Sequence, residues 1–245
     1  MSDAELLRRR DCFVAEGRLV VGRLLESGHD IESLLVNEAS LRFLQPALSV
    51  LPHGVPVYVC DTGDFTAITG FNLHRGCLAL ARRPVERTLI EVVQHAHLLL
   101  VLEAVTDADN IGSAFRNAAA FGARVVLTEA CCDPLYRKAV RTSTGSVLRT
   151  PYAHARDWPG DLDVLKRQGF TIAALTPRED AVALGTYSMQ PHIRLALLVG
   201  SEGSGLSAEA EAMADVRIRI PIRADVDSLN LATATGIALY KFANP

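Results

Sequence analysis

The chain contains 245 residues, of which 49% are hydrophobic and 22% are charged, and its formal net charge is −3. This composition is ordinary for a globular protein, and the length suits one large domain or two unequal domains. The negative total charge excludes a whole-chain basic footprint for nucleic acid, so any contact with RNA would have to come from local basic patches.

The N-terminal third of the chain alternates strand-like and helix-like segments. Residues 18–26 place Leu19, Val20, Leu24 and Leu25 at the spacing of an amphipathic helix. The alternation as a whole predicts a small α/β sandwich. The predicted strands are 13–17, 34–36, 55–59 and 77–80, and a second helical stretch runs from 41 to 51.

A polar stretch that contains a proline ends this pattern. Arg82-Arg83-Pro84 is followed by Val85-Glu86-Arg87, and proline restricts the backbone on both sides of itself. We therefore predict an N-terminal domain over residues 1–83, a linker over 84–94 and a second domain over 95–245.

The second region contains continuous apolar runs, which are typical of strands buried on both faces. Helix-like segments separate these runs, and the order predicts a parallel α/β sheet with helices on both sides. Ligands of such sheets bind beyond the carboxyl ends of the strands. The predicted strands are 98–102, 125–127, 171–175, 195–199 and 216–220, and the predicted helices are 111–121, 162–168, 208–214 and 229–242.

The first polar segment at such a strand end is Thr106–Asn117, which opens a helix. Asp109 or Asn110 can serve as its N-cap. A cap does not account for Arg116, which stands among alanine and phenylalanine residues. Taken alone, Arg116 reads as an ordinary helix arginine.

The second segment, Gly200–Ser207, is a glycine-rich turn that lets a ligand approach the backbone. It lacks the Gly-Lys-Ser/Thr end of a P-loop, and its glycines do not have the spacing of a dinucleotide-binding fingerprint. No Gly-x-Ser-x-Gly nucleophile elbow is present. Ser207 can cap the next helix, whereas Glu202 needs a partner that the sequence does not identify.

The third segment joins Ile220-Pro221 to Ser228-Leu229-Asn230, where the last helix begins. Asp227 or Ser228 can cap this helix. Small residues along the helix predict close packing against a neighbour, namely Ala232, Ala234, Gly236 and Ala238.

In this order and on these elements, the three segments resemble the motifs of the SpoU/TrmH family of RNA 2′-O-ribose methyltransferases, within the SPOUT superfamily. Residues 141–146 are similar to the serine- and glycine-containing segment that lies between the first two motifs. The resemblance spans residues 95–242. It rests on Asn110-x-Gly112-x-x-x-Arg116, on Gly200-Ser201-Glu202-Gly203-x-Gly205-Leu206-Ser207, and on Ile220-Pro221 with Ser228-Leu229-Asn230.

The resemblance implies a fold that periodicity does not show. It implies a parallel-sheet SPOUT domain with a deep trefoil knot, although true knots are rare. The preceding region, with Phe13–Gly17, resembles the small ribosomal-protein-like domain that binds the RNA substrate in this family. A homodimer is also implied, with the small-residue C-terminal helix as one of its elements.

The same resemblance assigns the site. The knot loops would hold S-adenosylmethionine, and the reaction would methylate a ribose 2′-hydroxyl of structured RNA, with ribosomal RNA favoured over transfer RNA. The residues implied for the cofactor are Leu175, Thr176, Gly200, Glu202, Ile220 and Leu229. The residues implied for catalysis are Arg116, Asn110, Glu202, Ser228 and Asn230.

Arg116 is the general base in proposals for the family, but an arginine pKa above about 12 makes deprotonation costly. Orienting the hydroxyl and stabilising developing charge need no proton transfer. Asn110 would orient the site, and Glu202 would position Arg116 or its neighbours. Ser228 and Asn230 would fix the third loop. No metal is implied, because the sulfonium already activates the methyl group.

Local basic residues offer phosphate contacts despite the negative total charge. Any one of them can equally be a solvated surface charge. The set consists of Arg124, Arg137, Lys138, Arg141 and Arg149, with Arg8, Arg9, Arg10, Arg18 and Arg75.

Cysteine usage and apolar runs bear on the compartment. The chain has 5 cysteines, without a Cys-x-x-Cys pair, which favours reduced thiols in a cytoplasmic protein over a disulfide framework or a zinc site. We expect neither a signal peptide nor a membrane span, because no apolar run has the required length.

Three other readings remain at this stage. A non-catalytic RNA-binding relative would keep the fold, but the joint presence of Asn110, Arg116, Glu202 and Asn230 argues against it. A base-modifying SPOUT enzyme is disfavoured by the first motif, and a nucleotide-binding oxidoreductase by the missing glycine fingerprint. One departure from the family pattern is Ala224, where relatives commonly carry glycine.

Overall fold

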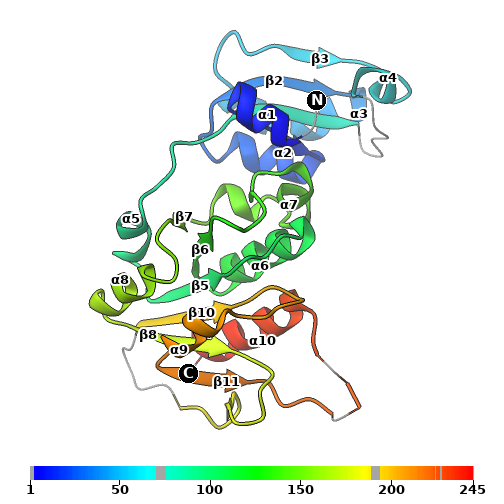
Figure 1. Ribbon diagram of the computed structural model, residues 1–245. Coiled ribbons are helices and arrows are strands. Elements are labelled where there is room, and N and C mark those ends of the chain that lie inside the picture. Colours follow the sequence, from blue (N-terminus) through cyan, green and yellow to red (C-terminus); the bar gives the residue numbers. More distant parts are fainter. Residues whose placement is uncertain (1–2, 70–75, 189–193, 224, 227, 245) are drawn as a thin grey trace. The chain divides into compact units, whose positions relative to one another are not determined.

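The computed structural model describes residues 3–69, 76–188, 194–223, 225–226 and 228–244, and the chain forms two compact units (Figure 1). Unit 1 consists of Met1–Val85 and Asp133–Arg149, and unit 2 consists of Glu86–Cys132 and Thr150–Pro245. The first boundary between the two units, after Val85, therefore lies inside the linker predicted over residues 84–94. The sequence placed Asp133–Arg149 in the second region, whereas in the structure this segment packs into unit 1.

Unit 1 is built on a four-stranded sheet in the order β1-β4-β2-β3. Its central strand β4 (Cys77–Arg82) runs antiparallel to β1 (Cys12–Glu16) and to β2 (Ile31–Val36), while β3 (Val57–Val59) is parallel to β2. All four predicted strands are present. β2 starts earlier than predicted, because polar residues near its start hide the apolar pattern.

The helical stretch predicted over residues 41–51 is in fact two elements, α3 (Glu38–Leu44) and the 3-10 turn η1 (Ala47–Val50). Asn37 starts α3 by accepting a hydrogen bond from the Ser40 N–H at 2.8 Å. Pro46 has no N–H to donate and separates the two elements. The other helices of unit 1 are α1 (Asp3–Arg10), α2 (Arg18–Leu25), α4 (Asp64–Thr69), α7 (Arg137–Thr142) and η2 (Ser146–Leu148).

Polar contacts explain why Asp133–Arg149 belongs to unit 1. Glu16 on β1 is 8% exposed, and its carboxylate lies 3.4 Å from the guanidinium of Arg141 and 3.6 Å from that of Arg137. Arg23 on α2 donates a hydrogen bond to the carbonyl of Thr144. These side chains are remote in sequence, so periodicity could not have paired them.

Unit 2 contains a seven-stranded, all-parallel sheet in the order β7-β6-β5-β10-β8-β11-β9. The five predicted strands are present. Two short strands were not predicted, because neither forms a continuous apolar run. The strands are β5 (Leu98–Leu102), β6 (Arg124–Thr128), β7 (Tyr152–Ala155), β8 (Phe170–Leu175), β9 (Val182–Ala183), β10 (Arg194–Val199) and β11 (Val216–Arg219).

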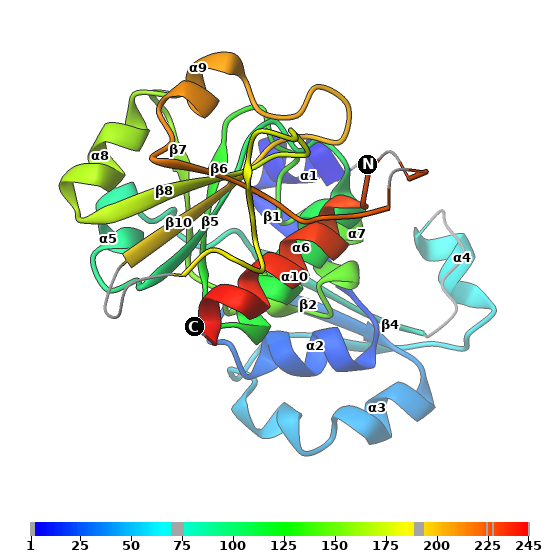
Figure 2. The same ribbon diagram turned by 90° about the horizontal axis from the view of Figure 1, so that it is seen from below.

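Helices cover both faces of this sheet (Figure 2). α6 (Ala108–Ala120) and α10 (Leu231–Ala243) lie on one face and pack against each other, with the Asn117 amide donating to the Ala232 carbonyl at 2.7 Å. A Cβ at Gly236 would lie 3.2 Å from the same amide, which confirms the predicted close packing. The other face carries α5 (Leu89–Val93), α8 (Asp161–Arg167) and α9 (Ala208–Ala212).

Arg194, the first residue of β10, binds the ends of α5 and α8 on the second face of the sheet. Its guanidinium donates to the carbonyls of Val93, Ala96 and Gln168, and it lies 4.2 Å from the centroid of the Phe170 ring. Val93 is the last residue of α5, and Gln168 is the C-cap of α8. One cation therefore satisfies the free carbonyls at two helix ends.

All five cysteines are free thiols, in agreement with the predicted absence of a disulfide framework. Burial raises the pKa of the Cys77 thiol to about 12. No helix in the described part of the chain has the length and apolarity needed to cross a membrane.

Candidate functional site

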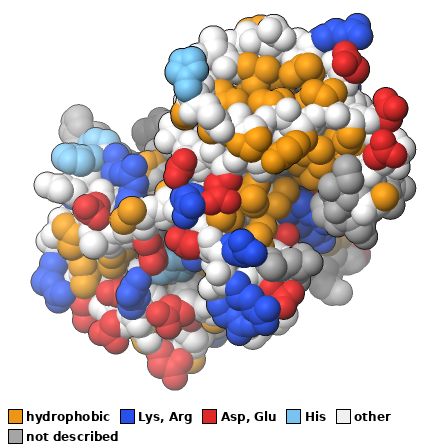
Figure 3. All heavy atoms as spheres, turned by 90° about the horizontal axis from the view of Figure 1, so that it is seen from above, with side chains coloured by type: hydrophobic (Ala, Val, Ile, Leu, Met, Phe, Trp, Pro, Cys, Tyr) orange, Lys and Arg blue, Asp and Glu red, His pale blue; other side chains and the backbone are white. Residues whose placement is uncertain are grey.

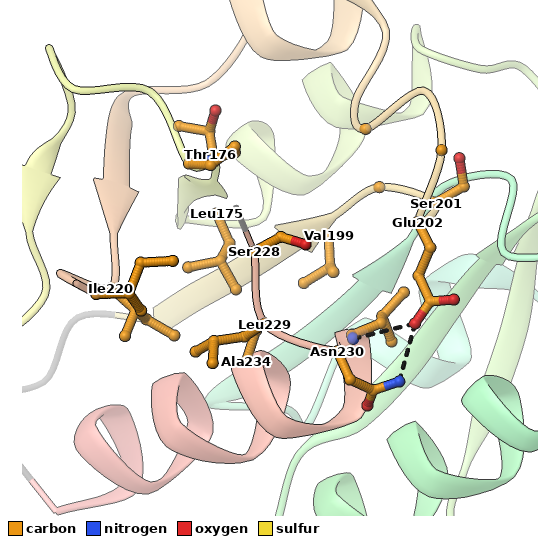
Figure 4. A pocket seen from close by; sticks show the side chains of 16 residues that line it. Leu175, Thr176, Val199, Ser201, Glu202, Ile220, Ser228, Leu229, Asn230 and Ala234 are labelled. Atoms are coloured by element: carbon orange, nitrogen blue, oxygen red, sulfur yellow. Dashed lines mark hydrogen bonds between the residues drawn. The ribbon is translucent and has the colours of Figure 1, made fainter. Parts of the chain in front are cut away.

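A pocket of about 520 Å³ opens at the carboxyl ends of the neighbouring strands β10, β8 and β11 (Figure 4). This volume is typical of small-molecule sites. Its wall comes from the loops that follow these three strands and from the first turn of α10. All six residues assigned to the cofactor by the resemblance lie on this wall, namely Leu175, Thr176, Gly200, Glu202, Ile220 and Leu229.

The loop after β10 folds back on itself, and only glycine fits where its two ends come closest. A Cβ on Gly200 would lie 2.1 Å from the carbonyl carbon of Gly205, which is shorter than any real contact. Gly205 has a φ of +70°, a left-handed conformation that favours glycine, and its N–H donates to the Ser201 carbonyl at 3.1 Å. Backbone atoms rather than side chains therefore form this part of the wall.

Glu202 and Asn230 join this loop to the start of α10. The Asn230 amide donates to the Glu202 carboxylate at 2.9 Å, and the Leu231 N–H donates to the same oxygen at 3.4 Å (Figure 4). The side-chain oxygen of Asn230, Oδ1, accepts from the N–H groups of Ala232 and Thr233, so Asn230 is the N-cap of α10. The predicted caps were wrong for this reason: Ser228 lies before the cap, and Asp227 is outside the described residues.

Asn110 extends the same network from α6. Its side-chain oxygen accepts from the Asn230 amide at 3.3 Å, and Asn110 is 8% exposed. The N-cap of α6 is Asp107, whose carboxylate accepts from the N–H groups of Asp109 and Asn110. The prediction that Asp109 or Asn110 caps this helix was wrong, because the chain turns into the helix two residues earlier. The Asn110 side chain is thereby free to reach Asn230.

The turn between β5 and α6 is held by side chains at the end of β6. Ala104 has a φ of 53° and donates its N–H to Thr128 Oγ1 at 3.0 Å. Val105 donates to the Cys131 sulfur at 3.4 Å, and the Cys131 thiol donates to the Leu102 carbonyl at 3.2 Å. Burial raises the pKa of the Cys131 thiol, which keeps it a neutral donor.

Arg116 is exposed on α6 and does not line the pocket. Six residues separate it from Asn110, which places the two side chains about 120° apart around the helix. Among the described residues, no side chain or carbonyl accepts a hydrogen bond from its guanidinium. Glu202 was expected to position Arg116 or its neighbours, and within one chain its carboxylate is bonded to Asn230 and Leu231 rather than to Arg116.

The character of the pocket follows from its wall. Aliphatic side chains line much of it, and Glu202 is the one charged residue among the described residues on its wall. The hydroxyls of Thr176, Ser201 and Ser228 add polar groups (Figure 4). The arrangement suits a ligand with a flat apolar portion and a cationic group. The wall also includes Ala234, one turn beyond Asn230, which the sequence pattern predicted only as a packing residue.

Most of the arginines predicted to contact phosphates have a partner within the chain, several of them in exposed ion pairs. Arg124 donates to the Val92 carbonyl at 2.9 Å near the end of α5, so it is a helix-capping residue. Arg8 and Arg10 are exposed, and the structure shows no side-chain partner for either among the described residues. Arg75 and Ala224 lie outside the described residues. The engaged pairs are Arg9 with Glu5, Arg18 with Ser40, Arg137 and Arg141 with Glu16, and Arg149 with Glu26.

Known sequences match most of the chain. The family model of the SpoU rRNA methylase family matches residues 97–240, which is more than half of its length. A Mycobacterium tuberculosis protein named uncharacterized tRNA/rRNA methyltransferase Rv0881 is 44% identical over 230 residues, which cover 93% of this chain and 79% of that protein. The Bacillus subtilis 23S rRNA (guanosine(2553)-2′-O)-methyltransferase RlmP is 27% identical over 234 residues, covering 95% of this chain and 88% of RlmP.

Solved structures match the fold. The crystal structure of an S-adenosylmethionine-bound rRNA methyltransferase from Sinorhizobium meliloti superposes with a TM-score of 0.82 at 26% identity, covering 97% of this chain and 89% of that chain. The match includes the parallel α/β sheet that carries the pocket.

Proposed function

The chain belongs to the SpoU rRNA methylase family of S-adenosylmethionine-dependent RNA methyltransferases, and we propose that it methylates a ribose 2′-hydroxyl of ribosomal RNA. The observation that carries this proposal is the pocket, on whose wall all six residues implied for the cofactor lie. Beside it, Asn110, Asn230 and Glu202 form one hydrogen-bonded chain from three separate motifs. The ribosomal substrate is supported by the name of RlmP.

The pocket residues fit S-adenosylmethionine in shape and charge. Leu175, Ile220 and Leu229 offer apolar surfaces for the faces of an adenine ring, and Gly200 leaves the backbone accessible to its polar edge. Glu202 offers a countercharge to a cationic group of the cofactor. The bound cofactor supplies a methyl group already activated by its sulfonium. The protein therefore has to bind the cofactor and the RNA, orient the 2′-hydroxyl toward the methyl group, and exclude water.

The catalytic roles follow from which groups are preorganised. The Asn230 side chain donates to Asn110 and Glu202 and caps α10 with its oxygen, so it acts by fixing Asn110. The NH₂ group of Asn110 can then orient a hydroxyl group without reorganisation. Ser228 lies on the pocket wall and adds a hydroxyl there. Arg116 would contact the RNA, orienting the 2′-hydroxyl or a neighbouring phosphate as a permanently charged donor.

The exposed face of α6 and α10 supports the proposed homodimer. Ile237 and Tyr240 on α10 are 41% and 62% exposed, and Ala119 and Ala120 on α6 are exposed as well. Arg116 lies on this face of α6. A second copy of the chain would cover these apolar side chains and would bring Arg116 to the subunit interface, which accounts for its absence from the pocket of its own chain.

Unit 1 is proposed to bind the RNA, as the ribosomal-protein-like domain of the family does. Within the part of unit 1 that the structure describes, the arginines of α2, of α7 and of the following turn have partners in the chain. On the face shown in Figure 3, hydrophobic side chains gather in a patch and charges of both signs alternate around it. The exposed Arg8 and Arg10 on α1 are the cations of unit 1 that we assign to RNA phosphates.

The deep trefoil knot is also part of the proposal. It is supported by the strand order β5-β10-β8-β11, in which β10 inserts between two earlier strands, and by the superposition on the Sinorhizobium meliloti enzyme. Stretching the protein from both termini in an optical trap tests it. A knotted chain extends to less than its full contour length, whereas full extension would exclude the knot.

The activity is tested by incubating the protein with labelled S-adenosylmethionine and total RNA from a host that lacks this gene, and by mapping ribose methylation. One new 2′-O-methyl site in ribosomal RNA is expected. A site in transfer RNA would correct the substrate. Cofactor binding without incorporation into any RNA, including assembled ribosomal subunits, would support the non-catalytic alternative.

A further inference from the structure

Glu103 is a buried carboxylate whose partners all carry no charge. It follows the last residue of β5, is 6% exposed, and donates its own N–H to the Val199 carbonyl at 2.9 Å. Its carboxylate accepts from Trp158 Nε1 at 2.6 Å, from the Ser207 N–H at 3.0 Å and from the Ser207 hydroxyl at 2.6 Å. Burying a carboxylate is costly unless such donors satisfy it, so this site is built around the charge.

Ser207 ends the glycine-rich loop that forms one wall of the pocket. Its hydroxyl donates to Glu103 and accepts from the Ala210 N–H at 3.2 Å, which makes Ser207 the N-cap of α9. Between Gly200 and Ser207, residues 202–205 are exposed and Leu206 packs only partly against the core. The loop has little apolar packing of its own, so its position depends on polar contacts at its two ends.

From this geometry we infer that Glu103 is a positioning residue for the cofactor-binding loop. Through Ser207 it fixes the end of the loop, and the close backbone contact between Gly200 and Gly205 couples that end to the pocket wall. Glu202 fixes the middle of the loop to Asn230. The inference rests on the proposed placement of S-adenosylmethionine in this pocket.

The substitution Glu103→Gln tests the charge and keeps the shape. A glutamine has one acceptor and one donor group in place of two acceptor oxygens. If the glutamine oxygen faces Trp158 Nε1, the glutamine NH₂ group faces the Ser207 N–H. In the opposite orientation the NH₂ group faces the Trp158 N–H. Two donors face each other in both cases, so the hydrogen bonds that hold the loop at Ser207 are lost or weakened.

The experiment measures the dissociation constant of S-adenosylhomocysteine by titration calorimetry on the full chain. We expect Glu103→Gln and Ser207→Ala each to weaken binding about tenfold, the effect of losing one strong hydrogen bond. The double variant should bind S-adenosylhomocysteine no more weakly than the weaker-binding of the two single variants, because both substitutions disrupt the same contact between Glu103 and Ser207. Glu16→Gln, which changes an equally buried carboxylate in unit 1, is the matched control and should stay within about twofold of the unmodified protein.

The chain has a single tryptophan, Trp158, which gives a second readout. Its emission should change when S-adenosylhomocysteine binds to the unmodified protein and should no longer respond in Glu103→Gln. In steady-state assays the KM for the cofactor should rise in this variant while the KM for RNA stays constant. A merely structural defect would lower stability without this split.

Two results would overturn the inference. One is a Glu103→Gln protein that folds and binds S-adenosylhomocysteine as the unmodified chain does. The other is full additivity of Glu103→Gln and Ser207→Ala. Should Glu103→Gln fail to fold, Ser207→Ala alone decides, since it leaves the Trp158 bond in place. Failure of the unmodified chain to bind would remove the proposed pocket and this inference together.

Discussion

Helices α6 and α10 contribute to two surfaces of unit 2, the pocket and the exposed face of the helix pair, and their side chains are bonded differently on each. On the pocket side, Asn110 from α6 and Asn230 from α10 bond to each other and to Glu202. On the exposed face, Arg116 and Tyr240 project from these helices without such a network. The part of the site that would hold a small molecule is complete within one chain, whereas the part that would meet a macromolecule is left open.

The largest effect is expected at Arg116. Arg116→Ala should lower methyl transfer by about 10³-fold, as expected for losing a charged donor in the transition state, while the cofactor dissociation constant changes less than about twofold. Single-turnover assays with calorimetry separate the two quantities. Arg167→Ala removes another exposed arginine of unit 2 and serves as control. A fully active Arg116→Ala protein would remove this residue from the mechanism.

Tyr240→Glu should break the proposed dimer, because a charge would be buried against the partner chain. We expect light scattering to give the mass of one chain and methyl transfer to fall about a hundredfold, the scale of a catalytic group lost with the partner. Tyr58→Glu is the matched control, since Tyr58 in unit 1 is 58% exposed and Tyr240 62%. An unmodified protein that is monomeric at micromolar concentration would contradict the dimer.

Asn230 combines two functions that two substitutions separate. Asn230→Ala removes both the cap of α10 and the bond to Glu202, and should lower the free energy of unfolding by about 1 kcal/mol. Asn230→Asp keeps a capping oxygen but sets a carboxylate against Glu202. Stability should then be nearly retained while cofactor affinity falls about tenfold, the effect of a lost charge-assisted bond. Equal cofactor affinity in the unmodified protein and in Asn230→Asp would show that the contact between Glu202 and Asn230 does not contribute to cofactor binding.

Charge reversal on α1 tests the role of unit 1. Arg8→Glu with Arg10→Glu should raise the KM for RNA severalfold and flatten its salt dependence, because two phosphate contacts are lost. The cofactor dissociation constant should not change. Arg42→Glu on α3, whose arginine is paired with Glu38, is the control. Unchanged RNA affinity would place the RNA on another face of unit 1.

The smallest effect concerns the turn before α6. Ala104 has a φ of 53°, which glycine adopts without strain. Ala104→Gly should therefore raise the free energy of unfolding, by up to about 1 kcal/mol, in urea titrations. The same change at Ala114, in the middle of α6, should lower it by about 1 kcal/mol or more, since glycine weakens a helix interior and a buried methyl group is lost. Destabilisation by Ala104→Gly would mean that the alanine methyl group packs favourably.

The fold was largely readable from the sequence, and the exceptions have physical causes. The strands of the unit 2 sheet were predicted because burial on both faces leaves continuous apolar runs. α1 and α5 were not predicted, since α1 buries only Leu7 and α5 lies in a stretch that resembles a linker. The N-caps of α6 and α10 were misplaced by a few residues, because Asp107 and Asn230 compete with other good capping residues nearby, whereas Ser207 caps α9 as predicted.

The sequence by itself determined the two α/β regions, the three motif segments and six residues of the pocket wall, because these depend on local patterns and on a family resemblance. Tertiary structure alone decided that Asp133–Arg149 joins unit 1, that Glu202 bonds to Asn230 and that Arg116 faces away from the pocket. It also placed Glu103 beneath the loop. Glu202 and Asn230 are 28 residues apart in the sequence, and Glu103 and Ser207 are 104 residues apart. Such pairings are fixed by side-chain geometry in the folded chain, and no periodicity encodes them.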